Sequence, residues 1–181
     1  MKLLVTGGYG FIGSNFILKL LENHTEFKIK NIDAELNGSN PKNLSKIENN
    51  KNYEFVKGNI TDYKLMKKLI SKCDIVVNFA AESFVDRSIN DASPFLVSNI
   101  LGTHTILDII TKEKKKMIQI STDEVFGSLE NESATEETKF NPTNPYAATK
   151  ASAELLINSY FTTYNSNVII TRCTNNYGPR Q

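Results

Sequence analysis

The sequence predicts an α/β fold built on a doubly wound parallel sheet, and three observations support this prediction. Short apolar runs typical of buried strands alternate with longer segments whose apolar residues recur at helical spacing. A glycine-rich turn at residues 7–13 separates the first such strand from the first helix. Asp33 ends the second strand 20 residues after Gly13 (33 − 13 = 20), where such folds carry a ribose-binding carboxylate. Residues 1–181 are therefore expected to form one Rossmann-type domain.

Six strands are expected where apolar side chains run without interruption, because strands covered by helices on both faces are apolar on both sides. Asn, Ser, Gly and Lys dominate residues 34–52 instead, which predicts a long, mobile loop. The expected strands cover residues 2–6, 28–32, 53–56, 74–79, 117–120 and 168–172.

Four helices between these strands have recognisable starting signals. The first gathers its apolar residues on one face. Asp62 is a typical capping residue for the second. Pro94 and Pro145 occupy the first helical positions of the other two, where a missing N–H group is tolerated. The expected helices cover residues 11–22, 62–72, 94–112 and 145–164.

The glycine-rich turn predicts a dinucleotide site. Gly7, Gly10 and Gly13 follow the spacing G-x-x-G-x-x-G, one residue longer than the common G-x-G-x-x-G fingerprint. Small residues let the backbone approach a pyrophosphate, whose negative charge then meets the first helical N–H groups. Asp33 would bind the adenosine ribose diol and would repel a 2′-phosphate, and no Arg follows nearby. NAD is therefore predicted in preference to NADP.

A second group of polar residues predicts chemistry at the same edge of the sheet. Thr122, Asp123 and Glu124 follow the apolar run at residues 117–120. Tyr146 and Lys150 are four residues apart and share one helix face. Either piece alone fits an acidic loop or an ordinary exposed i,i+4 pair. Together, behind a dinucleotide fingerprint, they suit oxidation of an alcohol coupled to loss of water.

Each of these residue types has a use in that chemistry. The Tyr146 phenol has an ordinary pKa near 10, and the ammonium group of Lys150 and a positive nicotinamide ring would both favour the phenolate. Thr122 could bind the same substrate hydroxyl. The ketone formed by oxidation acidifies the neighbouring C–H group. Two carboxylates could then accept that proton and protonate a departing hydroxyl.

Composition argues against several other classes of function. The 21 basic and 20 acidic residues give a net charge of +1, so no nucleic-acid partner is expected. No apolar stretch approaches about 18 residues, and Met1 leads directly into a strand, so neither a membrane span nor a signal peptide is expected. Cys73 and Cys173 are a hundred residues apart, which suits a reducing, cytoplasmic compartment. With two histidines, metal ligation is not expected.

Five segments resemble the extended short-chain dehydrogenase/reductase superfamily and, within it, the dTDP-glucose 4,6-dehydratase family. The resemblance extends along essentially all 181 residues. Its most discriminating part is the Thr-Asp-Glu-Val-Phe-Gly segment, because related epimerases and decarboxylases carry other residues in place of Asp123 and Glu124. The five segments are residues 7–13, 79–88, 121–127, 146–150 and 172–179.

The resemblance implies a role for each candidate residue. Asp123 would protonate the leaving C6 hydroxyl, Glu124 would be the base at C5, and Tyr146 the base at the C4 hydroxyl. The bound NAD would be regenerated in each cycle. The implied cofactor positions are Gly7, Gly10, Phe11, Ile12, Gly13, Asp33, Asn59, Ile60, Ala80, Ala81, Ser98, Tyr146, Lys150 and Asn176. The implied substrate positions are Ser83, Thr122 and Asn175.

The sequence departs from the family pattern in three places. Phe84 stands where a His is common, which affects a sugar or phosphate contact. Asn59 replaces an acid near the adenine, although its amide oxygen can still accept a hydrogen bond. Family members continue beyond the position of Gln181 with a nucleotide-sugar-binding region on the order of a hundred residues. The chain is expected to be a fragment or a short gene product, truncated before that region and inactive alone.

The helices at 94–112 and 145–164 carry extra apolar residues. Core packing explains part of them, and the resemblance implies a homodimer through these two helices. Two alternatives to the dehydratase remain: a nucleotide-sugar epimerase of the same superfamily and an NAD-binding module without turnover. The acid pair at Asp123 and Glu124 argues against the epimerase. The apolar residues are Phe95, Leu96, Ile106, Leu155, Leu156 and Phe161.

Overall fold

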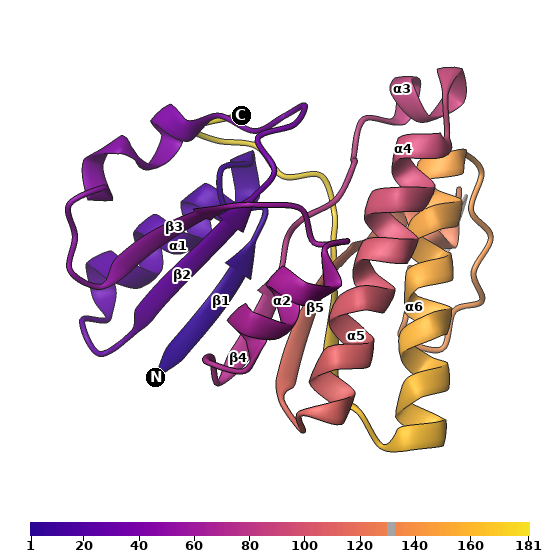
Figure 1. Cartoon of the computed structure of the whole chain (residues 1–181). Helices are drawn as coiled ribbons and strands as arrows, with labels where there is room; N and C mark the ends of the chain where they lie inside the picture. Colours follow the sequence, from indigo (N-terminus) through magenta and orange to yellow (C-terminus); the bar gives the residue numbers. More distant parts are fainter. Residues whose placement is uncertain (130–132) are drawn as a thin grey trace.

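Six parallel strands form a single sheet in this computed structural model, which describes residues 1–129 and 133–181 (Figure 1). The order is β3-β2-β1-β4-β5-β6, and each neighbouring pair runs parallel. The order reverses between β1 and β4, as in doubly wound dinucleotide-binding folds. The predicted fold class is therefore confirmed. The strands are β1 Lys2–Thr6, β2 Lys28–Asp33, β3 Tyr53–Lys57, β4 Ile75–Asn78, β5 Lys116–Thr122 and β6 Asn167–Cys173.

Helices cover both faces of the sheet. Leu3 and Leu4 are adjacent in β1 and point to opposite faces, so each belongs to a different buried cluster. The Leu3 cluster includes side chains from α1 (Phe11–Asn23), and the Leu4 cluster includes side chains from α2, α5 and α6 (Figure 1). The predicted helices are thus confirmed, with bounds α2 Tyr63–Ile70, α5 Thr103–Lys112 and α6 Pro145–Tyr164.

The prediction of a long loop over residues 34–52 is wrong for its middle part. A 3₁₀ helix, η1 (Pro41–Ile47), forms there and buries Leu44 completely against the sheet. Asn40 caps this helix, because its Oδ1 accepts a hydrogen bond from the Lys42 N–H at 3.1 Å. A single buried leucine within a polar stretch gives no periodicity, which explains why composition favoured a loop.

The helix expected over 94–112 is continuous but not uniform. It begins as α4 (Ser93–Phe95), passes through a π-helical stretch, η2 (Leu96–Gly102), and continues as α5. Gly102 lets Ile60 approach, since a Cβ atom at this position would lie 2.4 Å from Ile60 Cδ1. Two further short helices were not predicted, α3 (Val85–Asn90) and the 3₁₀ helix η3 (Asp123–Phe126). No helix in the described part of the chain is both long and apolar enough to cross a membrane.

Candidate active site

A cavity of about 840 Å³ opens at the carboxyl edge of the sheet, where the strand order reverses. Its volume falls in the range usual for small-molecule and cofactor sites, about 300–1,000 Å³. Fourteen of the predicted site residues line it. They are Gly7, Gly10, Phe11, Ile12, Gly13, Asp33, Asn59, Ile60, Ala80, Ala81, Ser83, Ser98, Tyr146 and Lys150.

The glycine-rich turn lies close against neighbouring backbone. Gly7 has φ +68°, and a Cβ atom there would lie 2.7 Å from the Ala80 Cα. A Cβ atom at Gly13 would lie 2.5 Å from the Gly7 carbonyl oxygen. Among the described residues, no side chain caps the start of α1. The first N–H groups of this helix are therefore available to an anion such as a pyrophosphate.

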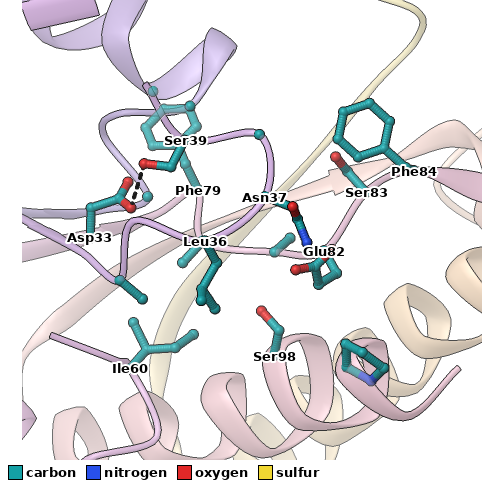
Figure 2. A pocket seen from close by; sticks show the side chains of 18 of the residues that line it. Asp33, Leu36, Asn37, Ser39, Ile60, Phe79, Glu82, Ser83, Phe84 and Ser98 are labelled. Atoms are coloured by element: carbon teal, nitrogen blue, oxygen red, sulfur yellow. Dashed lines mark hydrogen bonds between the residues drawn. The ribbon is translucent and has the colours of Figure 1, made fainter. Parts of the chain in front are cut away.

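Asp33 is buried in the cavity wall, with 7% of its surface exposed, and its carboxylate is held by three donors. Oδ1 accepts hydrogen bonds from the Glu35 N–H at 2.8 Å and the Ser39 hydroxyl at 2.9 Å (Figure 2). Oδ2 accepts one from the Tyr9 N–H at 2.9 Å. A carboxylate has about four acceptor positions, so Oδ2 keeps one for a ribose hydroxyl.

The opposite wall of the cavity contains residues that were not predicted. Leu36 and Asn37 lie on the loop after β2; the Asn37 side chain points toward Glu82 on the segment after β4, and Leu36 points toward Ile60 and Ser98 (Figure 2). The loop after β2 has no periodic pattern, so the sequence carried no signal for Leu36 and Asn37, whereas Glu82 and Phe84 lie in a segment that carries the family resemblance. The further lining residues include Ala34, Gly38, Ser39, Ser93, Pro94, Val97 and Ser121.

The predicted acid pair lies where β5 passes into η3. Thr122 caps η3, since its Oγ1 accepts a hydrogen bond from the Glu124 N–H at 3.2 Å. The same hydroxyl lies 3.3 Å from Asp123 Oδ1, to which it donates. The negative charges of Asp123 and Glu124 both raise the pKa of the Tyr146 phenol, and Thr122 forms a hydrogen bond with it. The structure therefore brings these four side chains close together.

The pKa of Tyr146 is raised to about 12, so Lys150 alone does not lower it as expected, while the expected effect of a nicotinamide ring stays a prediction. Burial is the largest cause, and the negative charge of Glu124 adds to it, while a hydrogen bond with Thr122 acts in the opposite direction. The Lys150 Nζ donates its hydrogen bond to the Ile120 carbonyl, at 2.6 Å, rather than to the phenol. The phenol therefore stays protonated at neutral pH in this structure.

A buried ion pair behind these residues was not predicted. Glu154 on α6 is fully buried, and Arg172 on β6 donates to it through Nη2 at 2.7 Å and Nε at 3.0 Å. Ser121 donates a further hydrogen bond to Glu154 at 2.5 Å. The guanidinium group lies 5.1 Å from the centre of the Phe126 ring. This network joins β5, β6 and α6 directly beneath Tyr146 and Lys150.

Five predicted site residues lie outside the cavity lining: Thr122, Asp123 and Glu124, at the end of β5 and the start of η3, and Asn175 and Asn176. Asn175 and Asn176 are exposed in the segment that follows β6. The Asn176 side chain donates to the Thr174 carbonyl at 2.9 Å. The segment then continues to α1, where Asn15 donates to the Pro179 carbonyl at 2.9 Å. Within residues 1–129 and 133–181, no cluster of three His, Cys, Asp or Glu side chains is placed to hold a metal ion.

Comparison with known proteins identifies the family of this chain. A family model described as GDP-mannose 4,6 dehydratase matches residues 4–181. The chain belongs to this family. The match includes the glycine-rich turn, the acid pair at the end of β5 and the Tyr146 helix, so the whole cavity lies within it.

Curated relatives extend beyond the residues of this chain. The chain is 46% identical over 182 residues to the low-salt glycan biosynthesis protein Agl12 of Haloferax volcanii and covers 58% of it. It is 41% identical over 184 residues to dTDP-glucose 4,6-dehydratase of Mycobacterium tuberculosis and covers 55% of it. Both alignments include 100% of this chain. The predicted resemblance is confirmed, and the chain spans little more than half the length of these relatives.

Solved structures share the fold along the whole chain. A dTDP-glucose 4,6-dehydratase from Streptomyces venezuelae, crystallised with NAD and TYD bound, has a TM-score of 0.96 and 41% identity. A UDP-glucose 4-epimerase from Thermotoga maritima, crystallised with UDP-glucose, has a TM-score of 0.89 and 30% identity. Each comparison covers 100% of this chain and 58% of the other. The fold of this part of the chain is therefore shared by a dehydratase and an epimerase and does not by itself distinguish the two reactions.

The environment of Lys150 predicts a pH-dependent difference in stability. Burial lowers its pKa from 10.5 to about 8, while the charge of Glu154 acts in the opposite direction. Below pH 8 the folded chain therefore carries a buried ammonium group at a cost, which falls as pH rises above 8 and is lost above about pH 10.5, where the side chain becomes neutral in both the folded and the unfolded state. Lys150→Met should raise the free energy of unfolding at pH 7 by about 2 kcal/mol, and the difference should shrink between pH 8 and 10.5.

Urea unfolding at several pH values measures this effect. The Ile120 carbonyl keeps a hydrogen bond from Gln119 at 3.1 Å in the variant, so little else is lost. Lys116→Met, at an exposed position at the start of β5, is the matched control and should show no such trend. A constant difference between wild type and Lys150→Met from pH 7 to 10.5 would contradict the assignment.

Proposed function

We propose that the protein containing this chain is an NAD-dependent nucleotide-sugar 4,6-dehydratase that converts dTDP-glucose to dTDP-4-keto-6-deoxyglucose. One observation carries the proposal. Asp123 and Glu124 are adjacent at the start of η3, directly after β5, and the negative charges of both act on Tyr146, which lines the dinucleotide cavity. Dehydration needs an acid and a base in addition to the group that takes the hydroxyl proton. The cytoplasmic location that we propose is supported by the free thiols of Cys73 and Cys173.

The cavity fits a dinucleotide such as NAD. The close approaches at Gly7 and Gly13 leave backbone where a pyrophosphate would lie, and Asp33 retains an acceptor for a ribose hydroxyl. Asn59, Ile60, Ala80, Ala81 and Ser98 would line the rest of the site, with Lys150 at the nicotinamide ribose and Asn176 reaching it from the segment after β6. When bound, NAD⁺ supplies a hydride acceptor and a positive charge beside the phenol.

The side chains of this chain would then divide the proton transfers. Tyr146 accepts the proton of the C4 hydroxyl, which Thr122 also contacts. Glu124 accepts the proton from C5, next to the new ketone. Asp123 gives a proton to the C6 hydroxyl as the C6–O bond breaks, so that oxygen leaves as water. Ser83, in the cavity wall, and Asn175 would contact the sugar.

Residues 1–181 would form the NAD-binding domain that carries the catalytic side chains. The remaining length of the relatives would supply the substrate-binding domain. A homodimer through residues 94–112 and 145–164 is supported by apolar side chains that the sheet leaves exposed. Phe95 and Ile106 do not contribute, because both are fully buried in the domain. The exposed side chains include Leu96, Leu101, Leu155, Phe161 and Tyr164.

A nucleotide-sugar epimerase is the second candidate, and the likeness to the Thermotoga maritima enzyme supports it. An epimerase has no hydroxyl to expel, so Asp123 and Glu124 would both lack a use. An NAD-binding module without turnover would leave the whole cluster around Tyr146 unused. The dehydratase reaction would use all four side chains, Thr122, Asp123, Glu124 and Tyr146.

Glu124→Gln in the full-length protein tests the proposed function. The variant should still oxidise C4 of dTDP-glucose, because Tyr146 is intact, but exchange of the C5 hydrogen with solvent deuterium should slow by about 10²-fold or more. Mass spectrometry of the sugar measures exchange, and absorbance of the reduced nicotinamide measures oxidation. Glu136→Gln, outside the site, is a control. Exchange at the wild-type rate in Glu124→Gln would mean that another group is the base.

Asp33 should set the preference for NAD⁺ over NADP⁺. Asp33→Ala should weaken NAD⁺ binding by about tenfold to a hundredfold, the range for loss of a charge-assisted hydrogen bond, and should weaken NADP⁺ binding less. Calorimetry with both cofactors measures this ratio. Asp62→Ala, at the exposed cap of α2, controls for loss of a negative charge. Equal weakening of both cofactors would indicate that Asp33 acts through the loop that it holds.

A further inference from the structure

The side chain of Asn144 connects the two elements that carry the candidate catalytic residues. Its Oδ1 accepts a hydrogen bond from the Ala147 N–H at 2.8 Å and so caps the start of α6. Its Nδ2 donates to Glu124 Oε2 at 3.0 Å. A helix cap needs the oxygen alone. The bond to Glu124 is therefore additional to capping.

The two hydrogen bonds fix which end of the amide faces the carboxylate. A backbone N–H group can donate to the oxygen but not to the nitrogen, so Oδ1 must face Ala147. The NH₂ group must then face Glu124, where it favours the ionised carboxylate as an acceptor. Asp has the same shape and caps equally well, but it would place a second carboxylate against Glu124. Ser would cap without an amide donor.

Other titratable groups lie near Glu124 at this point. Asp123 lies beside it in η3, Tyr146 faces it from α6, and Cys173 lies on the adjacent strand β6. Lys150 and Arg172 provide no direct neutralisation, because Lys150 donates to the Ile120 carbonyl and Arg172 is paired with Glu154. Asn144 is therefore the side chain that donates a hydrogen bond to the Glu124 carboxylate here.

We propose that Asn144 is a positioning residue that keeps the Glu124 carboxylate aimed at the substrate carbon acid, in addition to capping α6. The proposal rests on the proposed role of Glu124 as the C5 base. Asn144 itself would not touch substrate or cofactor. Its amide would set the orientation of the base relative to Tyr146, because the same residue fixes the start of the helix on which Tyr146 lies.

The hydrogen bond can be tested without turnover. In protein labelled with ¹⁵N-asparagine, the side-chain NH₂ signal of Asn144 should move as carboxyl groups protonate, in the region of about pH 3–5. This movement should disappear in Glu124→Gln. An NH₂ signal that follows pH identically in both proteins would overturn the proposed contact, whatever reaction the enzyme catalyses.

Kinetics of the full-length protein separate positioning from a structural role. In Asn144→Asp and Asn144→Ser, exchange of the C5 hydrogen should slow by about tenfold to a hundredfold, the loss expected for a hydrogen bond to a charged group. Oxidation at C4 should change little, because the cap is retained and Tyr146 stays in place. A merely structural role would slow both steps together, since Tyr146 and Lys150 are on the capped helix.

A matched control makes the outcomes distinguishable. Asn40 caps η1 in the same way, through Oδ1 to the Lys42 N–H at 3.1 Å, and its side chain is exposed. Asn40→Ser should leave C5 exchange unchanged. Equal slowing of both steps in the Asn144 variants, or exchange at the wild-type rate, would overturn the proposal. Failure of the wild-type protein to exchange the C5 hydrogen would refute the proposed function, while the NMR result would still decide the Asn144 contact.

Discussion

Tyr146→Phe is expected to slow oxidation of the substrate C4 hydroxyl by about 10²-fold or more, the scale of lost general-base catalysis. Burial and the charge of Glu124 raise the pKa of this phenol to about 12. The phenol can therefore accept a proton only with help from the positive charge of the bound cofactor. Removal of the hydroxyl leaves no group in its place. Single-turnover absorbance of reduced nicotinamide in the full-length protein measures this step.

Tyr160 offers a matched control on the same helix. Its hydroxyl lies 3.2 Å from His104 Nε2 on the exposed side of α6 and is not part of the cavity lining. Tyr160→Phe should leave the oxidation rate unchanged. If both variants slow oxidation equally, the effect comes from the helix rather than from the Tyr146 phenol. If neither does, a different group takes the C4 proton.

The sequence predicted those helices, strands and turns whose formation depends on residues close together in the chain. Apolar strands, capped helices and the 20-residue spacing to Asp33 each follow from chemistry within a few residues, and the structure has all of them. The 3₁₀ helix η1 depends instead on one contact, the burial of Leu44 under α1. The π-helical stretch η2 could not be predicted from the spacing of apolar residues either, because one wider turn hardly changes that spacing.

The same distinction applies to the site. The glycine-rich turn, Asp33 and Tyr146 were predicted because each has a fixed spacing from a strand or helix start, and all line the cavity. The lowered pKa of Lys150 and the raised pKa of Tyr146 were not predicted, because both shifts result from burial. Glu154 was missed for the same reason. Because Glu154 lies four residues after Lys150, its sequence position suggests an ordinary exposed i,i+4 pair. Only the packing of β6 against α6 shows that it is buried.

Glu154→Ala is expected to lower the free energy of unfolding by about 3–5 kcal/mol, because removal of one partner from a buried ion pair leaves the other charge uncompensated. The Glu154 side chain is 0% exposed and that of Arg172 is 21% exposed. The substitution also leaves the Ser121 hydroxyl without its acceptor. Urea unfolding of this chain measures the change. Asp108→Ala, which breaks the i,i+4 pair with Lys112 and a hydrogen bond from the Tyr63 hydroxyl at the surface, should cost no more than about 1 kcal/mol.

A double variant separates lost charge pairing from lost packing. Apolar residues of similar size often replace a buried ion pair without loss of stability. Glu154→Leu combined with Arg172→Met should therefore recover most of the stability that Glu154→Leu loses alone, and the coupling between the two sites should be large. The Arg172 guanidinium also packs on Phe126 and Phe140, so Met, with its flexible apolar chain, is the suitable replacement. Strictly additive losses in the double variant would mean that Glu154 and Arg172 stabilise the domain independently, and that the pair does not hold α6 to β6 beneath the active site.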